Sequence, residues 1–310
     1  MAVSLARVAR TVGNAVDDYL LVWVLCSVAL GVLVPGIAAL TPLVTPVLAV
    51  MIGSISLTLS PAAFRAVRPR ALGAILVVQT GMPVAAYAIA RGLGLDPTLT
   101  VGFVVLGAVT PELVAPVMTE LGEGDTALAT TALVCVGVGT LALVPGSVRL
   151  LVGEAVAFET GRVVEQLLLA VVGPMTVAVV ARARFPGRVG RHDEFYPSVS
   201  ALMVVLVIGI VTAANAEALR AGGTTLALVG AGAVALNAAG YAGGWLVSWS
   251  FSRAERVAAL FSVGMRDFAV AAALVVGAGF PTAAAVPAVV FGIVEMTTSA
   301  ALVKVLAGRD

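Results

Sequence analysis

Long apolar runs alternate along the chain with short stretches that hold most of the charges, prolines and glycines. A helix that crosses the hydrocarbon layer needs about 20 mainly apolar residues. Cutting the chain at its charges and its Pro/Gly clusters predicts ten such helices, over residues 19–39, 42–62, 71–90, 99–121, 126–148, 163–183, 198–216, 224–248, 255–278 and 282–307. The pattern therefore predicts an all-α polytopic membrane protein.

The composition supports this class and excludes others. Hydrophobic residues make up 60% of the chain and charged residues only 11%, whereas soluble chains are about 25% charged. A net charge of +1 lacks the basic excess of a nucleic-acid binder. Cys26 and Cys135 lie in apolar runs and His192 in a charged loop, so we expect no disulfide framework and no metal site. HExxH, GxSxG and P-loop motifs are missing from the sequence, so we expect neither an enzyme, nor a cofactor, nor ATP-driven transport.

The basic residues divide unequally between alternate loops, with thirteen on one side of the predicted membrane and four on the other. Since cytoplasmic loops carry the excess of Lys and Arg, we expect both termini in the cytoplasm of a cell inner (cytoplasmic) membrane. We expect residues 1–18 to be a cytoplasmic leader rather than part of a cleavable signal, because the apolar segment that follows is long enough to stay in the protein as a membrane-spanning helix.

A charged stretch that begins at Arg149 separates five predicted helices from five more. Because five is odd, the second half enters the membrane in the opposite sense, which is the inverted repeat common in secondary transporters. We therefore expect a first repeat over 19–148, a linker over 149–162 and a second, inverted repeat over 163–310.

The fourth predicted helix holds two prolines, Pro111 and Pro116, near its middle. Each removes a backbone donor and disfavours helix at the residue before it, so the helix is expected to break around 109–116. Glu112 lies inside the break, next to Thr110. A carboxylate at the bilayer centre costs about 2.5 to 3.5 kcal/mol on insertion scales, so it needs a partner or a function. The alternative is a proline-kinked structural helix in which Glu112 bonds nearby.

The ninth predicted helix is interrupted by Arg266 and Asp267, which follow Gly264. Neighbours on a helix point about 100° apart, so these two do not neutralise each other. Glu112 is the first candidate for the counter-charge of Arg266, and Glu295 is the second. If the two interrupted helices meet, these groups converge near the midplane, where such folds bind substrate; the alternative is a structural ion pair that locks two helices together.

Two weaker candidates complete the predicted site. Gln79 is a lone polar residue at mid-helix, and either lines the site or bonds a neighbouring helix. Thr297 either contributes to the site or bonds the backbone of its own helix.

Several segments resemble the bile acid:sodium symporter family. They are MIGSISLTLSPAAFRAVRPRALGAILVVQTGMPVAAYAIA, VMTELGEGDTALA, EAVAFETGRVVEQLLLAVVGPMTVAVVARARFP and VGMRDFAVAAAL. The resemblance spans nearly the whole chain and implies ten transmembrane helices as two inverted five-helix repeats, with crossed, broken fourth and ninth helices. It implies transport of a small-molecule substrate through a lipid membrane.

The family's sodium ligands, carried over by position, are mostly lost here. They fall on non-ligating or altered side chains at Ala115, Pro116, Ala129, Leu133, Ser262 and Arg266. Gln79 and the main-chain carbonyls of Val263 and Met265 remain as family-like contributors. We hypothesise a carrier that does not use sodium, in which Arg266 acts as a built-in cation and Glu112 as a new proton-binding group.

This hypothesis predicts a proton-coupled symporter or a uniporter for a small organic anion, since a permanent guanidinium favours a carboxylate substrate. Three alternatives stay open at this point. They are a sodium-coupled organic anion symporter, a non-transporting sensor or scaffold on the carrier fold, and a membrane enzyme that uses Glu112 and Asp267 as paired carboxylates.

Overall fold

A computed structural model describes residues 19–59, 67–153, 156 and 158–307. The predicted leader, residues 1–18, lies outside the described residues. All regular elements in the described part of the chain are helical, as predicted. The α-helices are α2 (Leu20–Leu33), α3 (Val44–Ser56), α4 (Pro69–Gly92), α5 (Pro97–Ala108), α6 (Ala115–Leu121), α7 (Thr126–Ser147), α8 (Thr160–Leu167), α9 (Gly173–Arg184), α10 (Pro186–Val189), α11 (Tyr196–Ala214), α12 (Ala216–Ala221), α13 (Gly223–Val247), α14 (Arg253–Gly264), α15 (Phe268–Gly277) and α16 (Val286–Ala307).

Shorter helical segments join some of these elements. 3₁₀ turns precede α3, α11 and α16, as η1 (Pro35–Leu43), η6 (Gly190–His192) and η7 (Thr282–Ala285). Two π-helical segments, η3 (Val148–Val152) and η5 (Leu168–Val172), follow α7 and α8.

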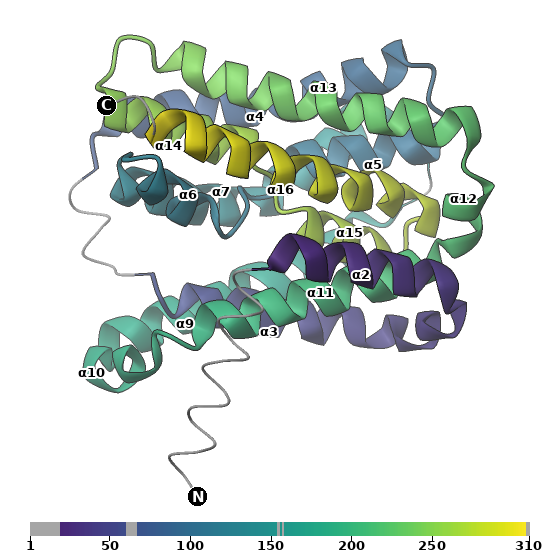
Figure 1. Cartoon of the computed structure of the whole chain (residues 1–310), viewed down its shortest axis with the longest axis horizontal. Helices are drawn as coiled ribbons and strands as arrows, with labels where there is room; N and C mark the ends of the chain where they lie inside the picture. The colour runs from purple at the N-terminus through teal and green to yellow at the C-terminus, as the bar shows by residue number, and fades with distance from the viewer. Residues whose placement is uncertain (1–18, 60–66, 154–155, 157, 308–310) are drawn as a thin grey trace, which may run out of the picture.

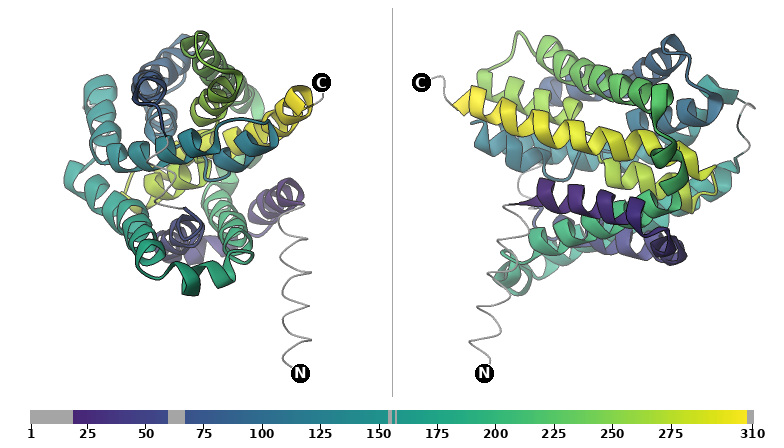
Figure 2. Two further views of the ribbon diagram at one scale, coloured as in Figure 1. Left: turned by 90° about the vertical axis from the view of Figure 1, so that its left-hand side faces the viewer. Right: turned by 45° about the vertical axis from the view of Figure 1, so that its right-hand side comes forward.

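The helices form two layers (Figure 1). One layer contains α4, α5, α6, α7, α13, α14 and α16, and the other contains α2, α3, α9 and α11. The two further views in Figure 2 show the same separation. α15 lies where the layers meet, since it packs against α16 and α5 on one side and against α3 and α11 on the other.

Eight helical stretches of the described residues are long and apolar enough to cross a membrane. They are Pro35–Ser56, Pro69–Gly92, Thr126–Val152, Thr160–Arg184, Tyr196–Ala214, Gly223–Val247, Arg253–Gly277 and Thr282–Ala307. Two further apolar helices, Leu20–Leu33 and Pro97–Ala108, are shorter than a full span and coincide with the first and fourth predicted helices. The chain is a multi-pass membrane protein. The count of ten spans and the inverted repeat stay predictions.

One end of the molecule gathers charged turns from distant parts of the chain. Arg253 at the start of α14 pairs with Glu123 at 3.0 Å and donates to the carbonyl of Leu306 at 2.8 Å. The N–H of Asp125 donates to the carbonyl of Ala254 at 2.9 Å. The turn between α6 and α7, the start of α14 and the end of α16 therefore lie together.

Candidate functional site

The first helix break separates α5, which ends at Ala108, from α6, which begins at Ala115. In an unbroken helix the carbonyl of Gly107 would accept the N–H four residues later, but that residue is Pro111, which has none. Val109, the C-cap residue of α5, is extended (φ −72°, ψ 174°). The predicted break is confirmed over residues 109–114, whereas Ala115 and Pro116 lie in the first turn of α6.

The second break separates α14, which ends at Gly264, from α15, which begins at Phe268. Here the side chain of Asp267 starts the new helix, because its Oδ1 accepts the N–H of Val270 at 2.8 Å as an N-cap. The predicted interruption at Gly264 to Asp267 is confirmed.

The two breaks are hydrogen-bonded to each other through their main chains. The N–H of Asp267 donates to the carbonyl of Thr110 at 3.0 Å, and the N–H of Glu112 donates to the carbonyl of Met265 at 3.3 Å. Irregular backbone at membrane depth needs such partners inside the protein. The interrupted helices therefore meet at their breaks, which brings together residues from both halves of the chain.

Arg266 is fully buried and binds the end of α5. Its Nη1 donates to the carbonyl of Gly107 at 3.0 Å and lies 3.5 Å from that of Val109. The guanidinium thus supplies the donor that Pro111 lacks. Among the described residues no carboxylate forms an ion pair with this guanidinium, so the expected Glu112–Arg266 pair is wrong. Glu295 is the carboxylate that Arg266 contacts, through the main chain, since the N–H of Arg266 donates to Glu295 Oε2 at 2.9 Å.

Three carboxyl groups lie buried at this point, with exposed fractions of 5% for Glu112 and 0% for Asp267 and Glu295. Within the described part of the chain, one oxygen of each has no hydrogen-bond partner, and neither do Nε and Nη2 of Arg266. Buried polar atoms in folded proteins are nearly always bonded to protein or to water. Such a cluster can therefore bind protons, ions, water or a polar solute.

A model of the Sodium Bile acid symporter family matches residues 45–221, more than half of the chain. The chain belongs to this family. The resemblance argued from the sequence motifs is therefore confirmed.

Two relatives match over most of this chain. "Uncharacterized sodium-dependent transporter YocS" of Bacillus subtilis (strain 168) is 25% identical over 278 residues, which cover 88% of this chain and 85% of that protein. "Probable sodium/metabolite cotransporter BASS2, chloroplastic" of Oryza sativa subsp. japonica is 26% identical over 255 residues, which cover 80% of this chain and 60% of that protein. Family membership indicates a solute transporter.

Other predicted site residues of this symporter-family chain are buried near the breaks or in the helices that support them. Gln79, in the middle of α4, and Ser262, in α14, are buried, and their side-chain polar atoms have no partner among the described residues, as is also true of the hydroxyl of Thr110. The carbonyl of Val263 lies against Gly240 of α13. Thr297 is an exception, because it is exposed and donates to the carbonyl of Ile293 in its own helix at 2.8 Å. Its assignment to the site is wrong.

Sequence reasoning missed two side chains that hold the second break. Asn237 Nδ2 donates to the carbonyl of Gly264 at 3.1 Å, and its Oδ1 accepts the hydroxyl of Thr298 at 2.8 Å. The signal was available in the sequence as a lone amide in a run of small residues. The neighbouring Thr298, rather than Thr297, bonds this amide.

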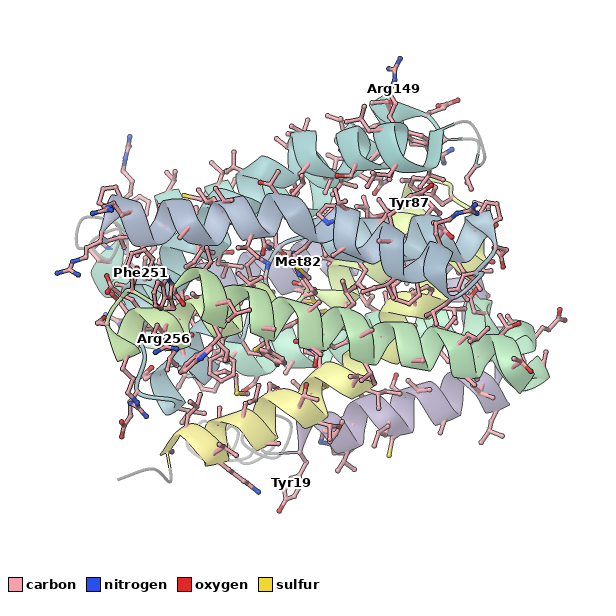
Figure 3. All side chains as sticks on the ribbon, turned by 90° about the horizontal axis from the view of Figure 1, so that it is seen from above. Tyr19, Met82, Tyr87, Arg149, Phe251 and Arg256 are labelled. Atoms are coloured by element: carbon pink, nitrogen blue, oxygen red, sulfur yellow. The ribbon has the colours of Figure 1, made fainter. Side chains whose placement is uncertain are left out.

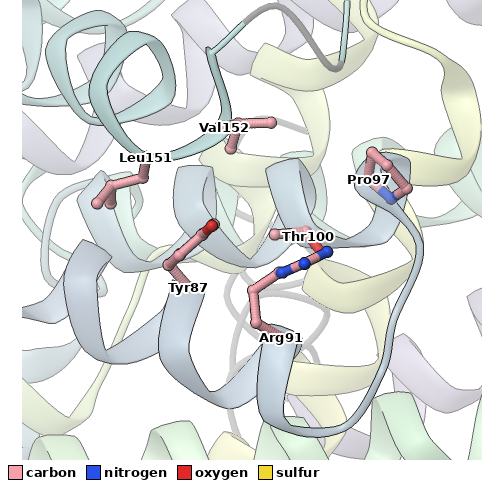
Figure 4. Close-up of a pocket in the computed structure, with 6 residues that line it drawn as sticks. All are labelled: Tyr87, Arg91, Pro97, Thr100, Leu151 and Val152. Atoms are coloured by element: carbon pink, nitrogen blue, oxygen red, sulfur yellow. The ribbon is translucent and has the colours of Figure 1, made fainter.

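A separate cavity has a volume of about 210 Å³, and Figure 4 shows the residues that line it. It is lined by residues at the end of α4, the start of α5 and η3, namely Tyr87, Arg91, Pro97, Thr100, Leu151 and Val152. No predicted site residue lines it, so it is not part of the candidate site.

Proposed function

We propose that this chain is a secondary transporter that moves a small organic anion by alternating access without sodium, either together with protons or as a uniporter. The observation that carries the proposal is the hydrogen bonding of Arg266 to the carbonyls of Gly107 and Val109. In broken-helix carriers, unwound carbonyls and half-helix C-terminal ends coordinate the coupling cation. Here the guanidinium of Arg266 binds carbonyls of this kind at the C-terminal end of α5.

A guanidinium is suited to replace a bound cation. It stays charged at all physiological pH values, and the negative end of the α5 dipole favours a positive charge at this position. Because Arg266 is covalently part of the protein, it cannot be exchanged during the transport cycle. A sodium gradient therefore has no ion to move at this position.

Charge balance supports proton coupling. Three buried carboxyl groups, Glu112, Asp267 and Glu295, lie at the breaks, where Arg266 has the one buried guanidinium among the described residues, and an uncompensated charge in an apolar interior is costly. Glu112 is the candidate proton carrier, because its Oε2 has no partner within the described residues, while Asp267 already caps α15 and Glu295 already accepts the N–H of Arg266. The charged groups that act on it electrostatically are Asp267 in the second break and Glu295 on α16. If the buried carboxyl groups keep their protons through the transport cycle, the carrier is a uniporter.

The anionic substrate is inferred from Arg266, whose Nε and Nη2 are left without partners in the described structure. A guanidinium fork binds a carboxylate in two places at once. The unequal arginine distribution supports a location in the cell inner membrane with both termini in the cytoplasm. The division into two inverted repeats, 19–148 and 163–310, is proposed with the same transport cycle.

A second candidate is a sodium-coupled organic anion symporter. It is favoured by the names of the two relatives, which describe a sodium-dependent transporter and a probable sodium/metabolite cotransporter. Under this candidate the unpartnered oxygens of Glu112, Asp267 and Glu295 would bind sodium rather than protons.

The melting temperature of the detergent-purified protein separates these candidates, since a ligand of the folded state raises it by mass action. We expect no difference between sodium chloride and choline chloride, and a saturable rise with some members of a panel of organic anions. Glu112→Gln should remove the dependence of that rise on pH. Arg266→Gln should abolish the response to anions, whereas Arg149→Gln, at a helix end, should keep it. A saturable sodium effect on the unmodified protein would favour the second candidate, and unaltered anion affinity in Arg266→Gln would refute the first.

A further inference from the structure

A second cavity, of about 560 Å³, lies where α4 begins and the chain turns from α13 into α14. Its lining includes Arg68, Arg70, Ser250, Phe251 and Glu255. Figure 3 shows Phe251 at the end of the molecule opposite to Tyr87 and Arg149. This is the end at which the charged turns of α6, α14 and α16 meet.

The cavity has more positive than negative charge available for a ligand. Its carboxylate, Glu255, is already engaged, because Oε2 accepts both the N–H of Ser252 at 3.0 Å and its hydroxyl at 2.7 Å. Oε1 of Glu255 lies 3.5 Å from Nη1 of Arg68, which is an exposed side chain. Arg70 is also exposed and forms no ion pair within the described residues. Both guanidinium groups therefore keep donors for an anion.

Apolar surface of the membrane-spanning helices borders this charged cavity. Trp249 and Leu246, at the end of α13, are 75% and 67% exposed, and Val77 on the adjoining α4 is 71% exposed. Tryptophan is enriched where a membrane protein passes the lipid headgroups. The guanidinium of Arg256, near the start of α14, stacks on Trp245 of α13, with Cζ 3.8 Å from the ring centroid. This contact keeps another positive charge at the same end of the molecule.

We infer that this cavity binds the headgroup of an anionic phospholipid, with the phosphate at Arg68 and Arg70 and the acyl chains along α4 and α13. Basic pockets between membrane helices recognise anionic headgroups in this way. A soluble phosphate would use the two arginines but not the apolar surface beside them. The inference does not depend on the transported substrate or on the coupling ion.

The test measures lipid binding to the full chain in neutral detergent, by native mass spectrometry and by the melting temperature. Phosphatidylglycerol is titrated against phosphatidylcholine and against inorganic phosphate. We expect saturable binding of phosphatidylglycerol that Arg68→Gln/Arg70→Gln weakens about 30-fold, since each basic group near the lipid contributes about a factor of five. The matched control, Arg91→Gln/Arg149→Gln, removes two arginines from the opposite end and should bind as the unmodified protein does.

Melting temperatures in phosphatidylcholine alone establish that both double variants fold. Equal binding of phosphatidylglycerol and phosphatidylcholine would overturn the inference, as would equal loss of binding in the two double variants. A shift with inorganic phosphate as large as that with phosphatidylglycerol would identify a soluble anion as the ligand and would also overturn it.

Discussion

The N–H of Asp267 donates to the carbonyl of Thr110 at 3.0 Å, and this bond joins an interrupted helix of the first half of the chain to one of the second half. Together with the bond from Glu112 to Met265 it forms a short two-way main-chain pairing between the two breaks. The side chains of Arg266 and Asp267 leave this pairing in different directions, one toward the end of α5 and the other onto the start of α15. Main-chain pairing therefore sets where the charged side chains of the site lie.

Glu295 is predicted to act on stability mainly as a hydrogen-bond acceptor for the N–H of Arg266. Glu295→Ala should lower the free energy of unfolding by about 1 to 3 kcal/mol, because it leaves a buried donor unpaired. Glu295→Gln keeps an acceptor oxygen and should lose less. Thermal unfolding of the purified variants measures this, with Thr297→Val on the exposed face of the same helix as the control. Equal losses in Ala and Gln would mean that the negative charge, rather than the acceptor, stabilises the break.

Asp267 is predicted to be needed as the N-cap of α15. Asp267→Ala should cost about 0.5 to 2 kcal/mol of stability, the range observed for lost caps, whereas Asp267→Asn keeps a capping oxygen. Comparing the melting temperatures of the two variants measures the cap separately from the charge. If Asn were as damaging as Ala, the role of this side chain in stability would be its charge.

Asn237, on the neighbouring helix α13, is predicted to stabilise the C-terminal end of α14 through its hydrogen bond. Asn237→Ala leaves the carbonyl of Gly264 without its donor and should lower stability by about 1 kcal/mol or more. Asn237→Asp should be worse, because it places a carboxylate against that carbonyl. Asn215→Ala is the matched control, since the side chain of buried Asn215, the C-cap residue of α11, donates to the carbonyl of Val211 in the helix that it caps. If Asn215→Ala lowered stability as much as Asn237→Ala, the hydrogen bond between helices would contribute no more to stability than a bond within one helix.

Gly240 is predicted to be required for the approach of α13 to the second break. A Cβ at this position would lie 2.7 Å from the carbonyl oxygen of Val263 and 2.8 Å from Cα of Gly264. Gly240→Ala should therefore cost about 1 to 3 kcal/mol, as overpacking typically does. Gly230→Ala, in the same helix, meets nothing within 4 Å and should be tolerated. Thermal unfolding of both variants measures the difference, and an unchanged Gly240→Ala would show that α13 can move away from the break without loss.

The sequence alone determined the helical class, the positions of both breaks and the family. Apolar runs of about 20 residues have one stable form in a membrane, because lipid offers no partners for unpaired backbone groups. Pro111 removes a helix donor wherever the rest of the chain lies, since the missing N–H is a property of the residue itself, although Pro83 and Pro145 lie inside continuous helices. Asp267 after Gly264 likewise marks a helix start through local backbone geometry.

Only the tertiary structure decided which groups meet at the breaks. The sequence suggested Glu112 as the partner of Arg266 on grounds of opposite charge, but the guanidinium reaches the carbonyls of Gly107 and Val109, and the carboxylate it contacts is Glu295. Asn237 bonds the end of α14, and Thr298 bonds Asn237, and neither contact follows from the sequence pattern. Helical periodicity specifies the face on which a side chain lies but not the neighbouring helix that it meets. That choice depends on the close approach of helices distant in the chain, which glycines such as Gly240 permit.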